Sequence, residues 1–224
     1  MKLTKVYKIL RRDPVIIAAY KTIGENEARA ADALAWHDMT HVARVLKYAA
    51  RTARLLKLDA DTTAAVKIAA LLHDIGCVNG GKTGPVPHAI KSFEWAGEYL
   101  AKFDIAPDKR DAILAAIREH TNGGTALVGK ILAFADKVDL HTTRLTPAGT
   151  LVVGNRQFGH FTGTHIDIRN GRLVVAFKTD EHLDHGEIEN YPFTKKLLWF
   201  IFDLAACCHL PHRITLDGRP WEIE

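Results

Sequence analysis

The chain has 224 residues, 47% hydrophobic and 25% charged, and is long enough to bury a sizeable core without disulfides. Its formal net charge of +4 suits an anionic ligand, but the basic residues are too few and too dispersed to predict nucleic-acid binding. No apolar run of secretory length follows the basic first residues. The most apolar segment, 197–210, contains Asp203 and is too short to cross a bilayer, so we expect no membrane span.

Cysteine usage indicates a reducing compartment. Of the three cysteines, Cys207 and Cys208 are adjacent, and the set forms neither a disulfide framework nor a CxxC zinc motif. We therefore expect a cytoplasmic protein, for which a homo-oligomer remains open.

Residues from Asp13 to about Leu145 follow helical periodicity almost throughout, which predicts a mainly α-helical domain over residues 1–145. Its helices are separated by turn-forming clusters at 24–26, 58–61, 77–87, 105–108 and 121–124. We expect Asp61 to cap the helix over 62–72, and we expect the helix that carries His41 to begin near Trp36.

After Pro147 the periodicity changes to that of short strands. Strands are predicted over 150–154, 164–169 and 172–178, with a tight turn at Asn170-Gly171 between the last two. A helix is predicted from Pro192 to about His209, followed by a hairpin that turns at Asp217-Gly218. Together these elements predict a small α+β appendage over residues 146–224, packed on the helical domain and covering one side of its site.

Histidines and aspartates occupy positions where the helical pattern predicts core residues. His120, for example, continues the apolar stripe of Ile113 and Ile117. A single histidine in such a place is more often a hydrogen-bonded core residue than a ligand. A buried carboxylate without a countercharge, however, costs on the order of several kcal/mol. The convergence of several such residues on successive helices favours a transition-metal site, whose predicted ligands are His41, His73, Asp74, His88, His120 and Asp136.

The order of these residues resembles a known family. His41, then LLHDIG at 71–76, His88, His120 and the first aspartate of FADKVD at 134–139 are similar to the HD-domain metal-dependent phosphohydrolase superfamily in its H, HD, H, H, D form. The match covers about residues 30–145. The run LHTTRL, the strand-rich tail and the closing ITLDGR also resemble an uncharacterised group of stand-alone HD proteins.

The resemblance implies an HD-domain helical bundle that holds two divalent transition-metal ions, drawn from Fe, Mn, Co, Ni or Zn. Within it, one ion has the ligands His41, His73, Asp74 and Asp136, and the second has Asp74, His88 and His120. Asp74 therefore bridges the two ions. Two ions about 3.5 to 4 Å apart activate a bridging water and neutralise charge on a phosphoryl group.

The segment WHDMTH at 36–41 is similar to the YHxxxH segment of cyclic-nucleotide phosphodiesterases, in which the first histidine protonates the leaving oxygen. His37 lies four residues before His41 and shares its face if both are helical. His37 is thus either a general acid or a group that supports the metal ligands.

We expect a small anionic phosphorylated substrate, nucleotide-like or simpler, cleaved at a phosphomonoester or phosphodiester bond by a metal-bound hydroxide. Three cations are predicted to bind or polarise its phosphoryl oxygens: Arg44, Lys82 and Lys137. A solvated helix position explains Arg44 equally well, and a flexible loop explains the glycines beside Lys82.

Two other functions remain open. Related HD folds with the same ligand types hold a di-iron centre that activates dioxygen, and ligand types do not distinguish this oxygenase from a hydrolase. The third alternative is a non-catalytic metal-binding or ligand-binding regulatory module. The presence of all six ligand types argues against it.

Overall fold

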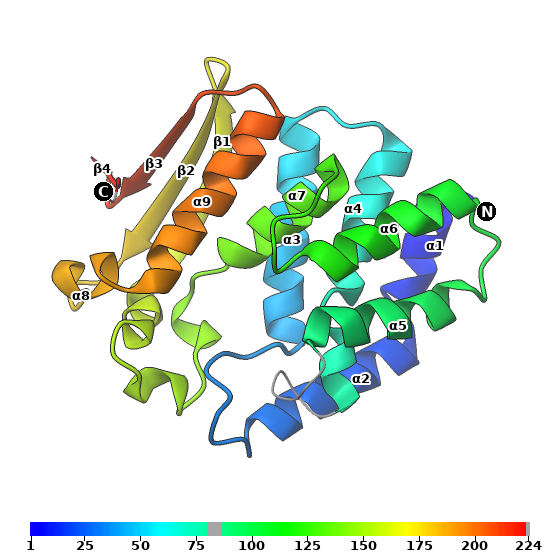
Figure 1. Ribbon diagram of the computed structural model, residues 1–224, viewed down its shortest axis with the longest axis horizontal. Coiled ribbons are helices and arrows are strands. Elements are labelled where there is room, and N and C mark those ends of the chain that lie inside the picture. The colour runs from blue at the N-terminus through cyan, green and yellow to red at the C-terminus, as the bar shows by residue number, and fades with distance from the viewer. Residues whose placement is uncertain (80–86, 223–224) are drawn as a thin grey trace.

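The computed structural model describes residues 1–79 and 87–222 and shows a helical part followed by a small C-terminal sheet with its own helices (Figure 1). The predicted fold class, mainly α with an α+β appendage, is confirmed. In the described part of the chain, we find no helix with the length and apolar character needed to cross a membrane.

The helical part is built from seven α-helices and one 3₁₀ turn among the described residues. These are α1 (Leu3–Leu10), α2 (Pro14–Glu27), α3 (Met39–Leu55), α4 (Ala60–Leu72), η1 (Ile75–Asn79), α5 (His88–Leu100), α6 (Pro107–Glu119) and α7 (Leu127–Lys137). Helix α1 was not predicted because its basic residues mask an apolar face of Leu3, Val6 and Leu10, which is buried.

Two helix starts differ from the prediction, and aspartate caps explain both. The side chain of Asp59 accepts hydrogen bonds from the N–H groups of Asp61 and Thr62, so Asp59 and not Asp61 caps α4. Asp38 caps α3 in the same way, which places the helix start at Met39 and not near Trp36.

The turn predicted at 24–26 is also wrong, because these residues lie within α2. Gly24 serves close packing there instead of a turn. A Cβ added at Gly24 would lie 3.3 Å from Cβ of Asp38, so the glycine lets the end of α2 approach the start of α3.

The C-terminal part begins with three 3₁₀ turns and continues into the sheet. Its elements are η2 (Thr142–Arg144), η3 (Gly149–Leu151), η4 (Asn155–His160), β1 (Phe161–Arg169), β2 (Arg172–Thr179), α8 (His185–Glu189), α9 (Pro192–Cys207), β3 (His212–Leu216) and β4 (Arg219–Pro220). The strand predicted over 150–154 is wrong: within residues 1–79 and 87–222 no strand pairs with this segment, part of which forms η3, and Leu151 is 82% exposed.

The other strand predictions are confirmed. The sheet has the order β1-β2-β3-β4, with β1 and β2 antiparallel across Asn170 and Gly171, both at positive φ. Strands β3 and β4 form the second hairpin across Asp217 and Gly218, which also have positive φ. Strand β3 pairs parallel to β2, and α9 makes the connection between them.

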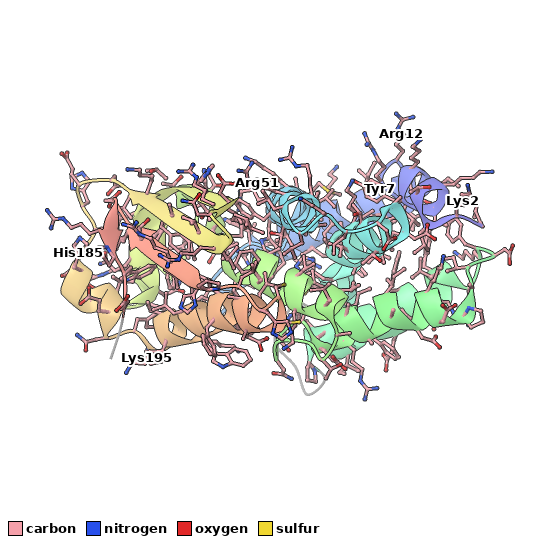
Figure 2. All side chains as sticks on the ribbon, turned by 90° about the horizontal axis from the view of Figure 1, so that it is seen from above. Lys2, Tyr7, Arg12, Arg51, His185 and Lys195 are labelled. Carbon is pink, nitrogen blue, oxygen red and sulfur yellow. The ribbon has the colours of Figure 1, made fainter. Side chains whose placement is uncertain are left out.

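Helix α7 lies at the centre of the molecule. It packs against α3, α4 and α6 on the helical side and against α9 of the C-terminal part, and β1 contacts α3. Figure 2 shows the molecule edge-on, with α1, α3 and α4 along one side and α6 and α9 along the other. The buried apolar side chains of both parts form one connected core. The end of α7 therefore lies where the helical and C-terminal parts meet.

Candidate metal centre

The six predicted ligands all lie at or near helix ends that converge in the buried interior. His41 is in the first turn of α3, His88 opens α5, and Asp136 is in the last turn of α7. His73 and His120 are the C-caps of α4 and α6, and Asp74 directly follows His73. The structure brings all six together in three overlapping groups, in each of which the potential ligand atoms lie within 4.8 Å of one another: His41 with His73 and Asp74, Asp74 with His88 and His120, and His73 with His120 and Asp136.

The carboxylate of Asp74 divides the cluster into two halves. Its Oδ2 lies 3.4 Å from Nε2 of His41 and 3.1 Å from Nε2 of His73. Its Oδ1 lies 3.4 Å from Nε2 of His88 and 3.6 Å from Nε2 of His120. Oδ1 of Asp136 lies 3.3 Å from Nε2 of His41. Neighbouring ligand atoms around an ion bound at about 2.1 Å are separated by about 3.0 to 3.5 Å, which these distances match.

Backbone carbonyls at two helix ends fix the orientation of the histidines. Nδ1 of His73 lies 2.9 Å from the carbonyl of Ala70, and Nδ1 of His120 lies 2.7 Å from that of Ile117. A carbonyl only accepts, so Nδ1 donates, and the Nε2 lone pair of the neutral ring faces the cluster. Nε2 of His73 is 3.3 Å from Nε2 of His41, and Nε2 of His88 is likewise 3.3 Å from Nε2 of His120.

The electrostatics of the cluster favour a bound cation. Burial opposes ionisation of Asp74, but His73 and the other histidines hold its pKa well below the ordinary value. Burial and Arg144 lower the pKa of His41, yet hydrogen bonds to aspartates raise it to about 9. Oδ1 of Asp74 is buried without a hydrogen-bond partner among the described residues. A divalent ion coordinated by these side chains satisfies this oxygen and the converging lone pairs, so the donor set fits the metal that the sequence predicts.

Asp139 supports His41 from the side away from Asp74. Its Oδ2 accepts from Nδ1 of His41 at 2.7 Å, and it is 1% exposed. Sequence reasoning missed this residue, although Asp139 follows Asp136 by three positions in FADKVD and could have been found as its neighbour at the end of α7.

The prediction that Arg44 binds substrate oxygens is not supported by its position. Its Nε and Nη2 donate to Asp139 at 2.5 and 3.1 Å, and its Nη1 donates to Thr143. Because the guanidinium is held behind His41, we assign Arg44 a positioning role through Asp139 and His41.

His37 precedes α3 and does not share a helical face with His41, which corrects the predicted geometry. It nevertheless lies beside the cluster, with its ring centroid 5.8 Å from that of His41 and 6.2 Å from that of His88. Nδ1 of His37 lies 2.5 Å from Oε1 of Glu27, a residue that sequence reasoning missed because nothing marks it ten positions away. Burial raises the pKa of Glu27 to about 7, against the hydrogen bond from the His37 N–H.

The two predicted lysines differ. Lys137 is 9% exposed, contacts Oδ2 of Asp136, and lies 5.4 Å from the centroid of the Phe200 ring. Its ammonium group therefore lies next to the ligand cluster. Lys82 lies outside the described residues.

A pocket of about 640 Å³ adjoins the cluster. Its charged lining residues include His37, Asp136, Lys137 and Arg144, and its apolar lining comes from both the helical and the C-terminal parts. Among the six clustered residues Asp136 therefore faces a chamber large enough for a small organic molecule, together with His37 and Lys137. Arg144 was missed as a site residue, although the run LHTTRL that contains it was noted as part of the resemblance.

Gly76 of LLHDIG sets the distance between η1 and α5. A Cβ at this position would lie 2.2 Å from the backbone nitrogen of Ser92, and the N–H of Gly76 donates to Oγ of Ser92 at 3.0 Å. The glycine thus allows α5 to approach the HD pair closely enough for His88 to join the cluster.

The chain is similar to known proteins of the HD type. The model of the HD domain family matches residues 38–140, a range that contains all six clustered residues. One similar solved structure is that of a predicted HD superfamily hydrolase from an uncultured Thermotogales bacterium, which is 32% identical in sequence. The alignment covers 62% of this chain and 74% of the bacterial chain, with a TM-score of 0.44. Among curated proteins, none matches the chain significantly.

Proposed function

The chain belongs to the HD-domain superfamily, and on this premise we propose that it is a metal-dependent phosphohydrolase that cleaves a phosphomonoester or phosphodiester bond of a small, nucleotide-like substrate. The observation that carries the proposal is Asp74, whose two oxygens face two separate histidine pairs while Oδ1 has no hydrogen-bond partner among the described residues. A carboxylate so placed suits a pair of divalent ions.

In this proposal His41, His73, Asp74 and Asp136 hold one ion, and Asp74, His88 and His120 hold the other. Such ions lower the pKa of a bound water and neutralise charge on a phosphoryl group. The ammonium group of Lys137 adds positive charge beside Asp136, where phosphoryl oxygens would lie.

We assign His37 the protonation of the leaving oxygen. Its ring lies beside both histidine pairs and faces the pocket, and Glu27 fixes its orientation through Nδ1. General acid catalysis requires a positioned ring with its second nitrogen toward the substrate. We also propose a cytoplasmic setting, which the free thiols of Cys207 and Cys208 support.

The test is a panel of phosphoesters incubated with the protein and with iron, manganese, cobalt or nickel, under nitrogen and in air. We expect phosphate release that depends on metal and not on oxygen. Oxygen consumption without phosphate release would instead identify the oxygenase, and neither activity would leave a binding module. Asp74→Asn should abolish release, whereas Asp111→Asn on the exposed face of α6 is the matched control.

A further inference from the structure

At the charged end of the pocket beside the cluster, Lys137 and Arg144 lie among the carboxyl groups of Glu27, Asp136 and Asp139. Lys137 already contacts Asp136, and Nε of Arg144 lies 3.6 Å from Oδ2 of Asp139. Nη1 of Arg144, however, is buried and has no hydrogen-bond partner among the described residues. Leaving a buried donor unpaired is unfavourable. Other atoms of the Arg144 side chain, which is 11% exposed, line the pocket, and because a guanidinium fork matches the geometry of phosphate oxygens, Arg144 offers a cation to an anionic group there.

The other end of the pocket is aromatic. Phe158 in η4, Tyr191 before α9 and Phe193 in the first turn of α9 line it. The ring centroids of Tyr191 and Phe193 lie 5.8 and 5.3 Å from that of Phe158. Rings at such separations pack favourably on one another and on a further planar group.

The size and polarity of the pocket restrict what fits. About 640 Å³ lies within the roughly 300–1,000 Å³ typical of small-molecule sites and is far more than a phosphate group needs. Beyond the charged end and the aromatic rings, the lining consists of leucine and alanine side chains and of the polar groups of Asn26, Asp32 and Asn155. A planar apolar group would bury its surface against the aromatic and aliphatic part of this lining.

We propose that the pocket selects a phosphoester whose alcohol part carries an aromatic ring, with Arg144 binding the phosphoryl group and with Phe158, Tyr191 and Phe193 contacting the ring. The inference rests on the proposed hydrolase function and specifies its substrate class. The selectivity comes from the C-terminal part of the chain, since all three rings follow η2 in sequence.

Binding tests the inference without requiring turnover. Calorimetry on the manganese-loaded protein compares 2-phenylethylphosphonate with ethylphosphonate, whose carbon–phosphorus bonds resist hydrolysis. We expect at least tenfold tighter binding of the ring compound. Phe193→Leu removes a ring but keeps apolar bulk, and should reduce this advantage to threefold or less. Phe202→Leu, at a 52% exposed position on the same helix, is the matched control.

The role of Arg144 is tested with the same probes. Arg144→Gln should weaken both phosphonates about tenfold and equally, while Arg172→Gln, at the exposed first residue of β2, should weaken neither. A variant that loses affinity for the ring compound alone would overturn the assignment of Arg144 to the phosphoryl group.

Turnover of adenosine 5′-monophosphate against ribose 5-phosphate identifies the source of the ring, because both esters release a primary alcohol and differ only in the base. Tighter binding of 2-phenylethylphosphonate than of ethylphosphonate indicates that the pocket accepts aromatic rings in general. Faster turnover of adenosine 5′-monophosphate, without a difference in affinity between the phosphonates, indicates that it accepts a nucleobase specifically. Equal affinity and equal turnover within both pairs would overturn the inference. Ring-dependent binding without any phosphate release would support the inference and contradict the proposed hydrolase function.

Discussion

Asp139 lies one contact away from the proposed metal, but it determines how His41 presents Nε2. Its carboxylate accepts from Nδ1 of His41 and is held in turn by Arg44. Asp139→Asn replaces an acceptor with an amide that can also donate, so we expect the affinity for metal to fall by about 10- to 100-fold. Competition with a chromophoric chelator measures this change. Asp167→Asn, at an ion pair on β1, is the control, and equal affinity in both variants would contradict the role of Asp139.

Glu27 should make stability depend on pH. Burial raises its pKa from 4.5 to about 7 in the folded chain. The stability that the protonated Glu27 carboxyl contributes is therefore fully present below pH 4.5, where this carboxyl is protonated in both the folded and the unfolded state. It is lost as pH rises through 7. Glu27→Gln stays neutral, so the chelated variant should gain roughly 1–3 kcal/mol over chelated wild type across that window. Urea titrations from pH 4 to 8 measure this gain.

The neighbouring exposed Glu25→Gln is the control for that comparison, and it should follow wild type at every pH. If the free energies of unfolding of Glu27→Gln and wild type differed by the same amount at every pH, the Glu27 carboxyl would have the same pKa in the folded and unfolded states.

The sequence predicted the clustered ligands but not their supporting residues, and the reason is local. Each ligand continues an apolar stripe or lies in a helix-end motif, so its own helix marks it as inward-facing. Glu27 and Asp139 acquire their roles from partners ten and about one hundred positions away, and Arg144 contacts Asp139 across the end of α7, none of which periodicity reveals. Arg44 shows the converse, because its nearness to His41 in sequence suggested a substrate contact, whereas its guanidinium donates to Asp139.

At the scale of the element, Gly76 should control the second half of the site. The Cβ of Gly76→Ala would meet the backbone of α5 at 2.2 Å, and backbone does not yield as a flexible side chain does. We expect a loss of about 1–3 kcal/mol in the free energy of unfolding, together with displacement of His88 and a stoichiometry nearer one metal. Chemical denaturation and elemental analysis measure the two effects.

Gly97→Ala on the same helix separates packing from helix propensity. There an added Cβ meets only a Leu114 methyl at 3.9 Å, so this variant should gain up to about 1 kcal/mol and keep its metal content. Normal metal content in Gly76→Ala would show that α5 tolerates displacement without moving His88.

Element types were more predictable than element boundaries. The hairpins at Asn170-Gly171 and Asp217-Gly218 were predicted correctly because residues at positive φ mark them locally. The segment 150–154 has the composition of a strand but lacks a partner, and partners are a tertiary property. The parallel pairing of β2 with β3 likewise depends on where α9 packs, which the sequence pattern does not state.

For the whole molecule, the candidate metal centre joins elements that are far apart in sequence. Its ligands come from the ends of α3, α4, α5, α6 and α7, and the aromatic rings that line the adjoining pocket come from η4, from the start of α9 and from the residue before it. Since α7 packs on both parts, a metal that binds to the ends of these helices should stabilise the helical and C-terminal parts together.

Metal removal should therefore lower the stability of the entire fold. A ligand present at 100 times its dissociation constant stabilises the native state by about 2.7 kcal/mol, and 1 kcal/mol corresponds to about 2–4 °C for a chain of this length. We expect chelation to lower the melting temperature by roughly 5–10 °C and re-addition of manganese to restore it, as calorimetry would show. Asp74→Asn should melt at one temperature with or without manganese, because the bridging carboxylate is lost. If manganese instead raises the melting temperature of wild type and Asp74→Asn equally, the ion binds elsewhere and the six residues do not form its site.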